Sequence, residues 1–129
     1  MAQQERARLR LAFRGLGSIP AKTIENTGAR IRELDLSHNK FQDLTSVGHY
    51  TRLETLVLDN NRVSSHTKIP RLPCLTTLWA NNNEITNMAT FVDKLVDSVP
   101  RLKYLSMLGN EACPNFLSGG SLKQYRDYR

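Results

Sequence analysis

The stretch Ile31-Arg-Glu-Leu34-Asp-Leu36-Ser-His-Asn39 is the first of four that share one residue pattern. The others are Leu53-Glu-Thr-Leu56-Val-Leu58-Asp-Asn-Asn61, Leu75-Thr-Thr-Leu78-Trp-Ala80-Asn-Asn-Asn83 and Leu102-Lys-Tyr-Leu105-Ser-Met107-Leu-Gly-Asn110. The closing asparagines are spaced by 22, 22 and 27 residues. One accidental match would carry little weight, but four in tandem indicate a repeat protein.

The middle of each unit predicts a short β-strand, because side chains alternate between the two faces of a strand. Two apolar residues of each strand should face the core, namely Leu34 and Leu36, Leu56 and Leu58, Leu78 and Ala80, Leu105 and Met107. Further apolar residues follow each asparagine in register, at Phe41, Val63, Ile85 and Ala112. No unit can bury its apolar edge alone, so the units should stack.

The asparagine that ends each unit has a separate predicted role. The backbone turns after the strand, which leaves N–H and C=O groups without ladder partners. An Asn amide can both donate to and accept from such groups. We therefore expect a structural ladder of Asn39, Asn61, Asn83 and Asn110.

The third unit is longer than the first two, and its extra residues predict a helix between Asn87 and Pro100. Phe91, Leu95 and Val99 recur every four residues, as on the buried face of an amphipathic helix. Thr90 is the expected N-cap and Pro100 the stop signal. The first two units should carry short convex connectors instead.

The ends of the chain predict caps. Residues 1–30 form a basic segment in which residues 10–14 alternate and could add an atypical first strand, with Leu16, Ile19 and Ile24 covering the first repeat. Residues 1–8 have little apolar content and are expected to be frayed or helical. Four repeats should fill 31–112. Residues 113–129 look like the start of an incomplete cap, so we expect self-association through an open C-terminal edge.

The repeated pattern L-x-x-L-x-L-x-x-N is the leucine-rich repeat consensus. The short units resemble the SDS22-like class of leucine-rich repeats, which is intracellular and includes the spliceosomal A-prime protein and many ciliary and scaffolding proteins. This resemblance implies an α/β fold: a short curved solenoid with a parallel β-sheet on the concave face. Mixed short helices and connectors would cover its convex face.

Within that class, the run Leu108-Gly-Asn-x-Ala-Cys-Pro-Asn115 and the 27-residue unit are similar to a member connected with melanocyte differentiation. That likeness implies a cytoplasmic adaptor linked to pigment organelles and endosomal trafficking. It also implies a Rab-type small GTPase or an adaptor complex as partner. Any membrane association would then be peripheral and indirect.

Charge is unevenly distributed along the chain, whose formal net charge is +6. Residues 1–32 hold seven basic and two acidic residues, residues 33–100 six and eight, and residues 101–129 five and two. Arg6, Arg8, Arg10 and Arg14 could contact an acidic partner, a phosphate or an anionic lipid. A solvated basic tail is the simpler interpretation. Phe13 is the only aromatic residue in that segment and makes no set for base stacking, so nucleic-acid binding is not favoured.

The sequence predicts no catalytic, metal or cofactor site. It lacks the glycine-rich phosphate-binding motifs and the H-E-x-x-H and paired C-x-x-C motifs. His38 lies near Asp35 and Asp59 in the predicted arrangement, but the spacing does not support metal ligation. Cys74 and Cys113 are far apart in the repeat order, so we expect no structural disulfide. We therefore expect a non-enzymatic protein.

The concave face holds the candidate binding residues. Each strand should place outward side chains in three rows: Glu33, Thr55, Thr77 and Tyr104; Asp35, Val57, Trp79 and Ser106; and Ser37, Asp59, Asn81 and Leu108. One end of the face would be acidic, through Glu33, Asp35 and Asp59. The other would be apolar and aromatic, through Val57, Trp79, Tyr104 and Leu108. Trp and Tyr are enriched among interface hot spots, which predicts partner binding there.

Three functions remain open from the sequence. The leading one is an adaptor that binds a protein through the concave face. The second is a nuclear ribonucleoprotein scaffold that grips a helix of an RNA-binding protein, as in the spliceosomal A-prime protein. The third is anionic-lipid or nucleic-acid binding through the basic N-terminus, which should weaken steeply with salt.

Overall fold

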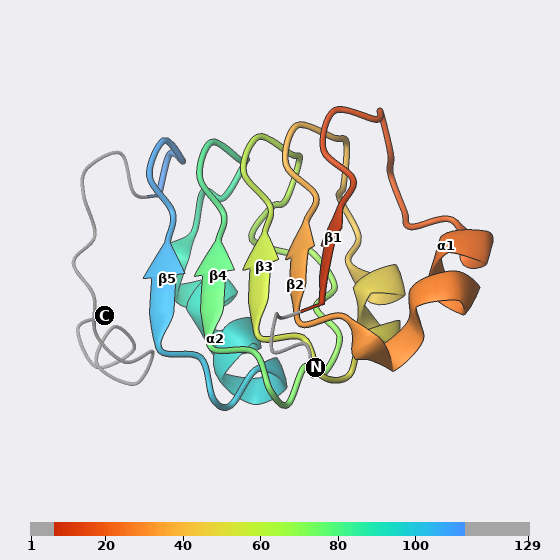
Figure 1. The fold of residues 1–129 in the computed structure, drawn as a ribbon. Helices are drawn as coiled ribbons and strands as arrows, with labels where there is room; N and C mark the ends of the chain where they lie inside the picture. Colours follow the sequence, from red (N-terminus) through yellow and green to blue (C-terminus); the bar gives the residue numbers. More distant parts are fainter. Residues whose placement is uncertain (1–6, 113–129) are drawn as a thin grey trace.

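A computed structural model describes residues 7–112 and contains one parallel sheet of five strands in the order β1-β2-β3-β4-β5. The strands are β1 (Arg8–Arg10), β2 (Glu33–Asp35), β3 (Thr55–Val57), β4 (Thr77–Trp79) and β5 (Tyr104–Ser106). They lie side by side in chain order (Figure 1), as expected when each repeat stacks only on its neighbours. The predicted α/β leucine-rich repeat solenoid is confirmed.

The strand pairing has the register that the repeat pattern predicts. Leu34, Leu56, Leu78 and Leu105 are direct partners across the four repeats. These side chains are at most 5% exposed, as are Leu36, Leu58, Ala80 and Met107 two positions later. Phe41, Val63 and Ile85 are fully buried, and Ala112 packs against the same core. The core is therefore continuous along the solenoid.

The N-terminal strand begins earlier than predicted. It covers Arg8–Arg10, and Leu9 pairs with Leu34. Ala7 already accepts hydrogen bonds through its carbonyl from the Arg32 and Glu33 amides, so the end of the segment expected to be frayed or helical is ordered. The apolar pair of this repeat is Leu9, which packs against the core, and Leu11, which is buried. The Leu11 amide continues the strand pairing by donating to the Asp35 backbone carbonyl.

Helix α2 (Met88–Ser98) occupies the longer third unit and lies behind the sheet in Figure 1. Phe91, Val92 and Leu95 are buried on its inner face, as the four-residue spacing predicts. Thr90 is not the N-cap: Asn87 is, and its side chain accepts a hydrogen bond from the Thr90 amide. Asn competes well with Thr at this position because its short amide reaches the first free N–H groups.

The remaining elements are short. Helix α1 (Ala21–Thr27) and the 3₁₀ turn η1 (Gly28–Arg30) lie beside the β1 end of the sheet, and η2 (Thr45–His49) forms the connector of the first repeat. The sequence did not predict α1. Ile19 is buried, and Leu16 and Ile24 pack against the core, so these three residues cover the first repeat as expected.

The connector of the second repeat contains no helix between Thr55–Val57 and Thr77–Trp79, in agreement with Pro70 and Pro73. The predicted C-terminal cap and open edge involve residues 113–129. They lie outside the described residues.

Candidate partner-binding face

The solvent-facing side of the sheet, called the strand face below, is built from two rows of paired residues. Arg8, Glu33, Thr55, Thr77 and Tyr104 are successive partners in the first row. Arg10, Asp35, Val57, Trp79 and Ser106 form the second. Both rows match the sequence-based arrangement, with β1 adding one arginine to each.

An aromatic patch lies at the β4–β5 end of the strand face, and we define it as Val57, Trp79, Tyr104 and Leu108. Trp79 is 43% exposed and Tyr104 61% exposed, although both lie in regular strands. Val57 is the direct cross-strand partner of Trp79, and Tyr104 lies one row away on the next strand. Large aromatic side chains in water favour burial against another surface.

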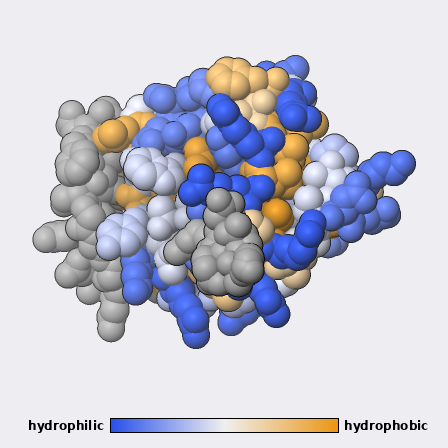
Figure 2. Space-filling model, in the orientation of Figure 1, coloured by the Kyte–Doolittle hydropathy of each residue, from blue (hydrophilic) through white to orange (hydrophobic). Residues whose placement is uncertain are grey.

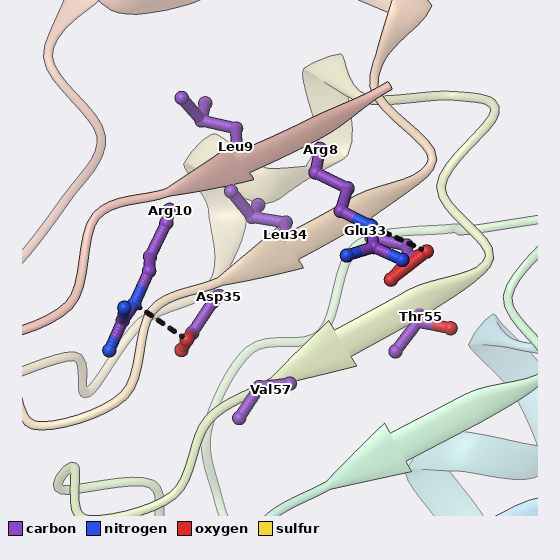
Figure 3. A pocket seen from close by; sticks show the side chains of 8 residues that line it. All are labelled: Arg8, Leu9, Arg10, Glu33, Leu34, Asp35, Thr55 and Val57. Carbon is purple, nitrogen blue, oxygen red and sulfur yellow. Dashed lines mark ion pairs between the residues drawn. The ribbon is translucent and has the colours of Figure 1, made fainter. Parts of the chain in front are cut away.

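An arginine end lies over β1 and β2, and we define it as Arg8, Arg10, Glu33 and Asp35. Arg8 Nε lies 3.3 Å from Glu33 Oε1, and Arg10 Nε lies 3.5 Å from Asp35 Oδ2. Figure 3 shows both pairs, with Thr55 and Val57 of β3 beyond them. These residues line a hollow of about 340 Å³. The predicted acidic end is therefore covered by two arginines.

The third row of predicted contact residues bonds mainly within the protein. Asp59 Oδ1 accepts from the Asn81 amide at 2.9 Å, and Asp35 Oδ1 accepts from the Ser37 amide at 2.9 Å. Asn81 Oδ1 accepts at 2.7 Å from both the Ser106 hydroxyl and the Leu108 amide. Asp59 is thus a turn-stabilising residue as well as a predicted contact, and Leu108 is half-buried next to Asn81.

The surface colouring separates the two ends of the strand face. In Figure 2 the surface over β4 and β5 is mostly pale, whereas strongly hydrophilic side chains gather over β1 and β2. Trp79 and Tyr104, the exposed aromatic residues of β4 and β5, have intermediate hydropathy, which agrees with the pale colour over these strands. One sheet therefore presents two chemically different surface regions.

The asparagine side chains stand in line along the edge where the strands end. Asn61 Nδ2 donates to the carbonyls of Leu36, Leu58 and Asp59, while its Oδ1 accepts from the Phe41 amide at 2.9 Å. Asn110 bonds two amides and two carbonyls, and is 2% exposed. Asn39 and Asn83 likewise each accept from backbone amides and donate to backbone carbonyls. Asn39 is buried, whereas Asn83 is half-buried.

The residue before each ladder asparagine has a left-handed backbone, and so does Phe13, which precedes Arg14 at the equivalent place of the first repeat. The φ angles are +60° at Phe13, +57° at His38, +60° at Asn60, +56° at Asn82 and +77° at Gly109. Gly, Asn and His tolerate this region, whereas a bulky residue such as Phe is an outlier there. Phe13 is 68% exposed and stacks on His38, with ring centroids 4.2 Å apart.

The histidines and the described cysteine form no reactive cluster. His38 Nε2 lies 3.3 Å from Asn60 Nδ2 and its ring stacks on Phe13, while the His38 backbone amide donates to the Asp59 carbonyl at 2.9 Å. The carboxylates of Asp35 and Asp59 instead accept from the Ser37 and Asn81 amides. Within 7–112, no three His, Cys, Asp or Glu side chains are grouped to hold a metal. Cys74 is free and half-buried, whereas Cys113 lies outside the described residues.

A second hollow, of about 310 Å³, lies away from the strand face and is lined by polar side chains including Asp43, Arg62 and Lys68. The Thr45 hydroxyl and amide both donate to the Asp43 carboxylate. These bonds, the hydroxyl first, lower the pKa of Asp43 below its usual value because they favour the charged form. The effect stabilises a connector turn and indicates no chemistry.

None of the helices between residues 7 and 112 is both long and apolar enough to cross a membrane. The open parallel sheet, its asparagine ladder and its exposed strand face define a leucine-rich repeat module, a kind of fold that typically mediates protein interactions. The family model described as Leucine-rich repeat matches residues 6–128, so the chain belongs to the leucine-rich repeat family.

Human leucine-rich melanocyte differentiation-associated protein is 44% identical to the chain over 81 residues. The match covers 63% of this chain and 40% of the human protein, so the chain spans less than half the length of that relative. The resemblance expected from the 27-residue unit and the Ala112-Cys113-Pro114-Asn115 run is confirmed. Together, family and relative indicate a protein-interaction role.

Proposed function

We propose that this chain is a non-catalytic adaptor that binds a protein partner on its strand face, with the aromatic patch as the centre of contact. The single observation that carries the proposal is the exposure of Trp79 and Tyr104 on neighbouring strands of a regular sheet. Val57 and Leu108 extend the apolar area. Asp35, opposite Val57, and Asp59, which accepts from the Asn81 amide, form its charged edge. Glu33 lies farther along the same face, paired with Arg8.

The proposed setting is the cytoplasm, in trafficking steps that accompany pigment-cell differentiation. The likeness to the human melanocyte differentiation-associated protein supports this setting. A Rab-type small GTPase or an adaptor complex is the proposed partner class, again by resemblance. The aromatic patch suits either, because protein interfaces centre on buried aromatic residues.

The experiment is a pull-down from cytosol with the wild-type chain and with Trp79→Ala. Removing the indole should weaken partner binding by about 2 kcal/mol or more while leaving the melting temperature nearly unchanged, because the ring packs little against the core. Phe13→Ala is the matched control, since Phe13 is also an exposed aromatic residue but lies in a turn outside the patch.

Equal loss of partner in both variants would show that any exposed aromatic residue serves, and the proposed site would be wrong. A Trp79→Ala variant that melts far lower but binds normally would assign Trp79 to the core instead.

A further inference from the structure

The charge that the β1–β2 end presents to solvent is positive, although the sequence predicted an acidic edge there. The side chains of Arg8 and Arg10 are 75% and 74% exposed, whereas those of Glu33 and Asp35 are 27% and 31% exposed. The carboxylates therefore lie beneath the guanidinium groups. A molecule that approaches this end of the strand face meets arginine first.

Each arginine is oriented by its carboxylate but retains donors for a further ligand. Both ion pairs are made through Nε, at 3.3 Å for Arg8 and 3.5 Å for Arg10. Among residues 7–112 the two arginines make no other ion pair and no hydrogen bond between side chains. A guanidinium is a planar fork of five N–H donors, so its terminal nitrogens can bind a second carboxylate.

We propose that the partner segment held by the aromatic patch carries acidic residues that bind Arg8 and Arg10, an inference that rests on the proposed function. The segment thus has two parts, a pair of Asp or Glu carboxylates at one end and an apolar side chain at the other. The hollow between the arginines and β3, lined also by Thr55 and Val57, receives the chain that joins them.

Strand geometry sets the spacing of this segment. Arg8 and Arg10 are two residues apart on one strand, and so are separated by roughly 6.7 Å, the distance between alternate residues in an extended chain. Trp79 lies three strands away from Arg10, or roughly 14 Å at about 4.8 Å per strand. An extended peptide crosses that distance in about four residues at 3.3 Å per residue.

A carboxylate peptide fits this end better than a phosphate surface does. The arginine end has two positive and two negative groups, so its net charge is zero and its long-range attraction for phosphates is weak. Binding there depends on short-range bidentate geometry, which arginine offers to phosphates as well as carboxylates, so the apolar surroundings decide between the two. The adjoining apolar row of Val57 and Trp79 provides contacts for peptide side chains.

The test is a selection of random peptides, long enough to cross the strand face, on the full chain. Selected peptides should be enriched in an acidic pair about four residues from a large apolar residue. The double variant Arg8→Glu with Arg10→Glu should weaken them about tenfold or more, and high salt should weaken the wild-type complex. Lys22→Glu with Arg71→Glu is the matched control, because both residues are exposed and lie off the strand face.

A neutral variant, Arg8→Gln with Arg10→Gln, separates loss of contact from loss of fold, since it places no new negative charge against Glu33 and Asp35. It should melt like the wild type and bind the acidic peptides several-fold more weakly. Unchanged binding by this folded variant would overturn the inference.

The other outcomes are distinguishable. Peptides that depend on Trp79 but show no acidic enrichment would overturn this inference and leave the proposed function standing. A selection that yields no peptide weakened by Trp79→Ala would count against both. Phosphatidylserine vesicles that bind the wild type and not the glutamate variant, with no acidic enrichment, would assign the arginines to a membrane and overturn the inference.

Discussion

At β1 and β2 the strand face carries two arginine–carboxylate pairs, whereas at β4 and β5 it carries Trp79 and Tyr104. Both ends use the same strand length, register and buried leucines. The backbone template therefore fixes where an outward side chain stands but leaves its chemistry free. Such independence explains how one small solenoid can combine an apolar contact with a charged one.

The asparagine ladder is what both ends share, and its removal should give the largest effect. Asn61→Ala leaves the Phe41 amide without a partner, while the Leu36 and Leu58 carbonyls each lose one donor but keep the Asn39 or Asn83 side chain. An unpaired buried amide costs about 1–3 kcal/mol and each lost hydrogen bond to a carbonyl about 0.5–1.5 kcal/mol, so we expect a loss of about 3 kcal/mol in the free energy of unfolding. Chemical denaturation followed by circular dichroism measures it.

Asn83→Ala is the comparison, because Asn83 is half-buried and should cost less. A loss below about half a kcal/mol for Asn61→Ala would show that the ladder is not structural. The two ends would then share the buried leucines but no structural asparagine ladder.

The left-handed position sharpens the comparison, because it holds Gly109 at the β5 end and Phe13 at the β1 end. Gly109→Ala introduces a Cβ atom at φ +77°, where it would overlap Asn82 Oδ1. We expect a loss of about 2 kcal/mol, made up of the left-handed penalty of about 1–2 kcal/mol and the displacement of Asn82. Thermal melting tests this, and an unchanged melting temperature would contradict the assigned conformation.

Phe13→Asn should have the opposite sign and a smaller size. Asn tolerates φ +60° and already occupies the equivalent positions Asn60 and Asn82. The relieved strain of about 1–2 kcal/mol is partly offset by the lost stack on His38, worth about 0.5–1.5 kcal/mol. We expect a net gain of about 0.5 kcal/mol. A clear loss in the same melting assay would mean that the stack dominates.

Most of the repeat architecture could be predicted from sequence because it depends on apolar spacing. The alternation of Leu34 and Leu36, repeated three times, specifies the strands, their faces and their register. The helix after Asn87 followed from its four-residue periodicity. Its N-cap was misassigned because Asn87 and Thr90 are both good capping residues, and the choice depends on where the backbone leaves the helix.

The charged end of the face could not be predicted, because it depends on a register that few residues specify. Only Leu9 and Leu11 mark the first strand, and Arg14 stands where the other repeats have asparagine. Placing this strand two residues too late moved Arg8 away from Glu33. The left-handed turn could not be predicted either, because His38 and Phe13 are not residue types that indicate a positive φ, as Gly109 is.

The central claim is that a partner covers the aromatic patch, and the intrinsic fluorescence of the chain tests it most directly. The chain has one tryptophan, so its emission reports Trp79 alone when the bound peptide or partner contains none. Binding should shift the emission to shorter wavelength and protect it from acrylamide quenching, because burial removes water from the indole. A partner that binds fully while the emission and quenching of Trp79 remain unchanged would contradict the account.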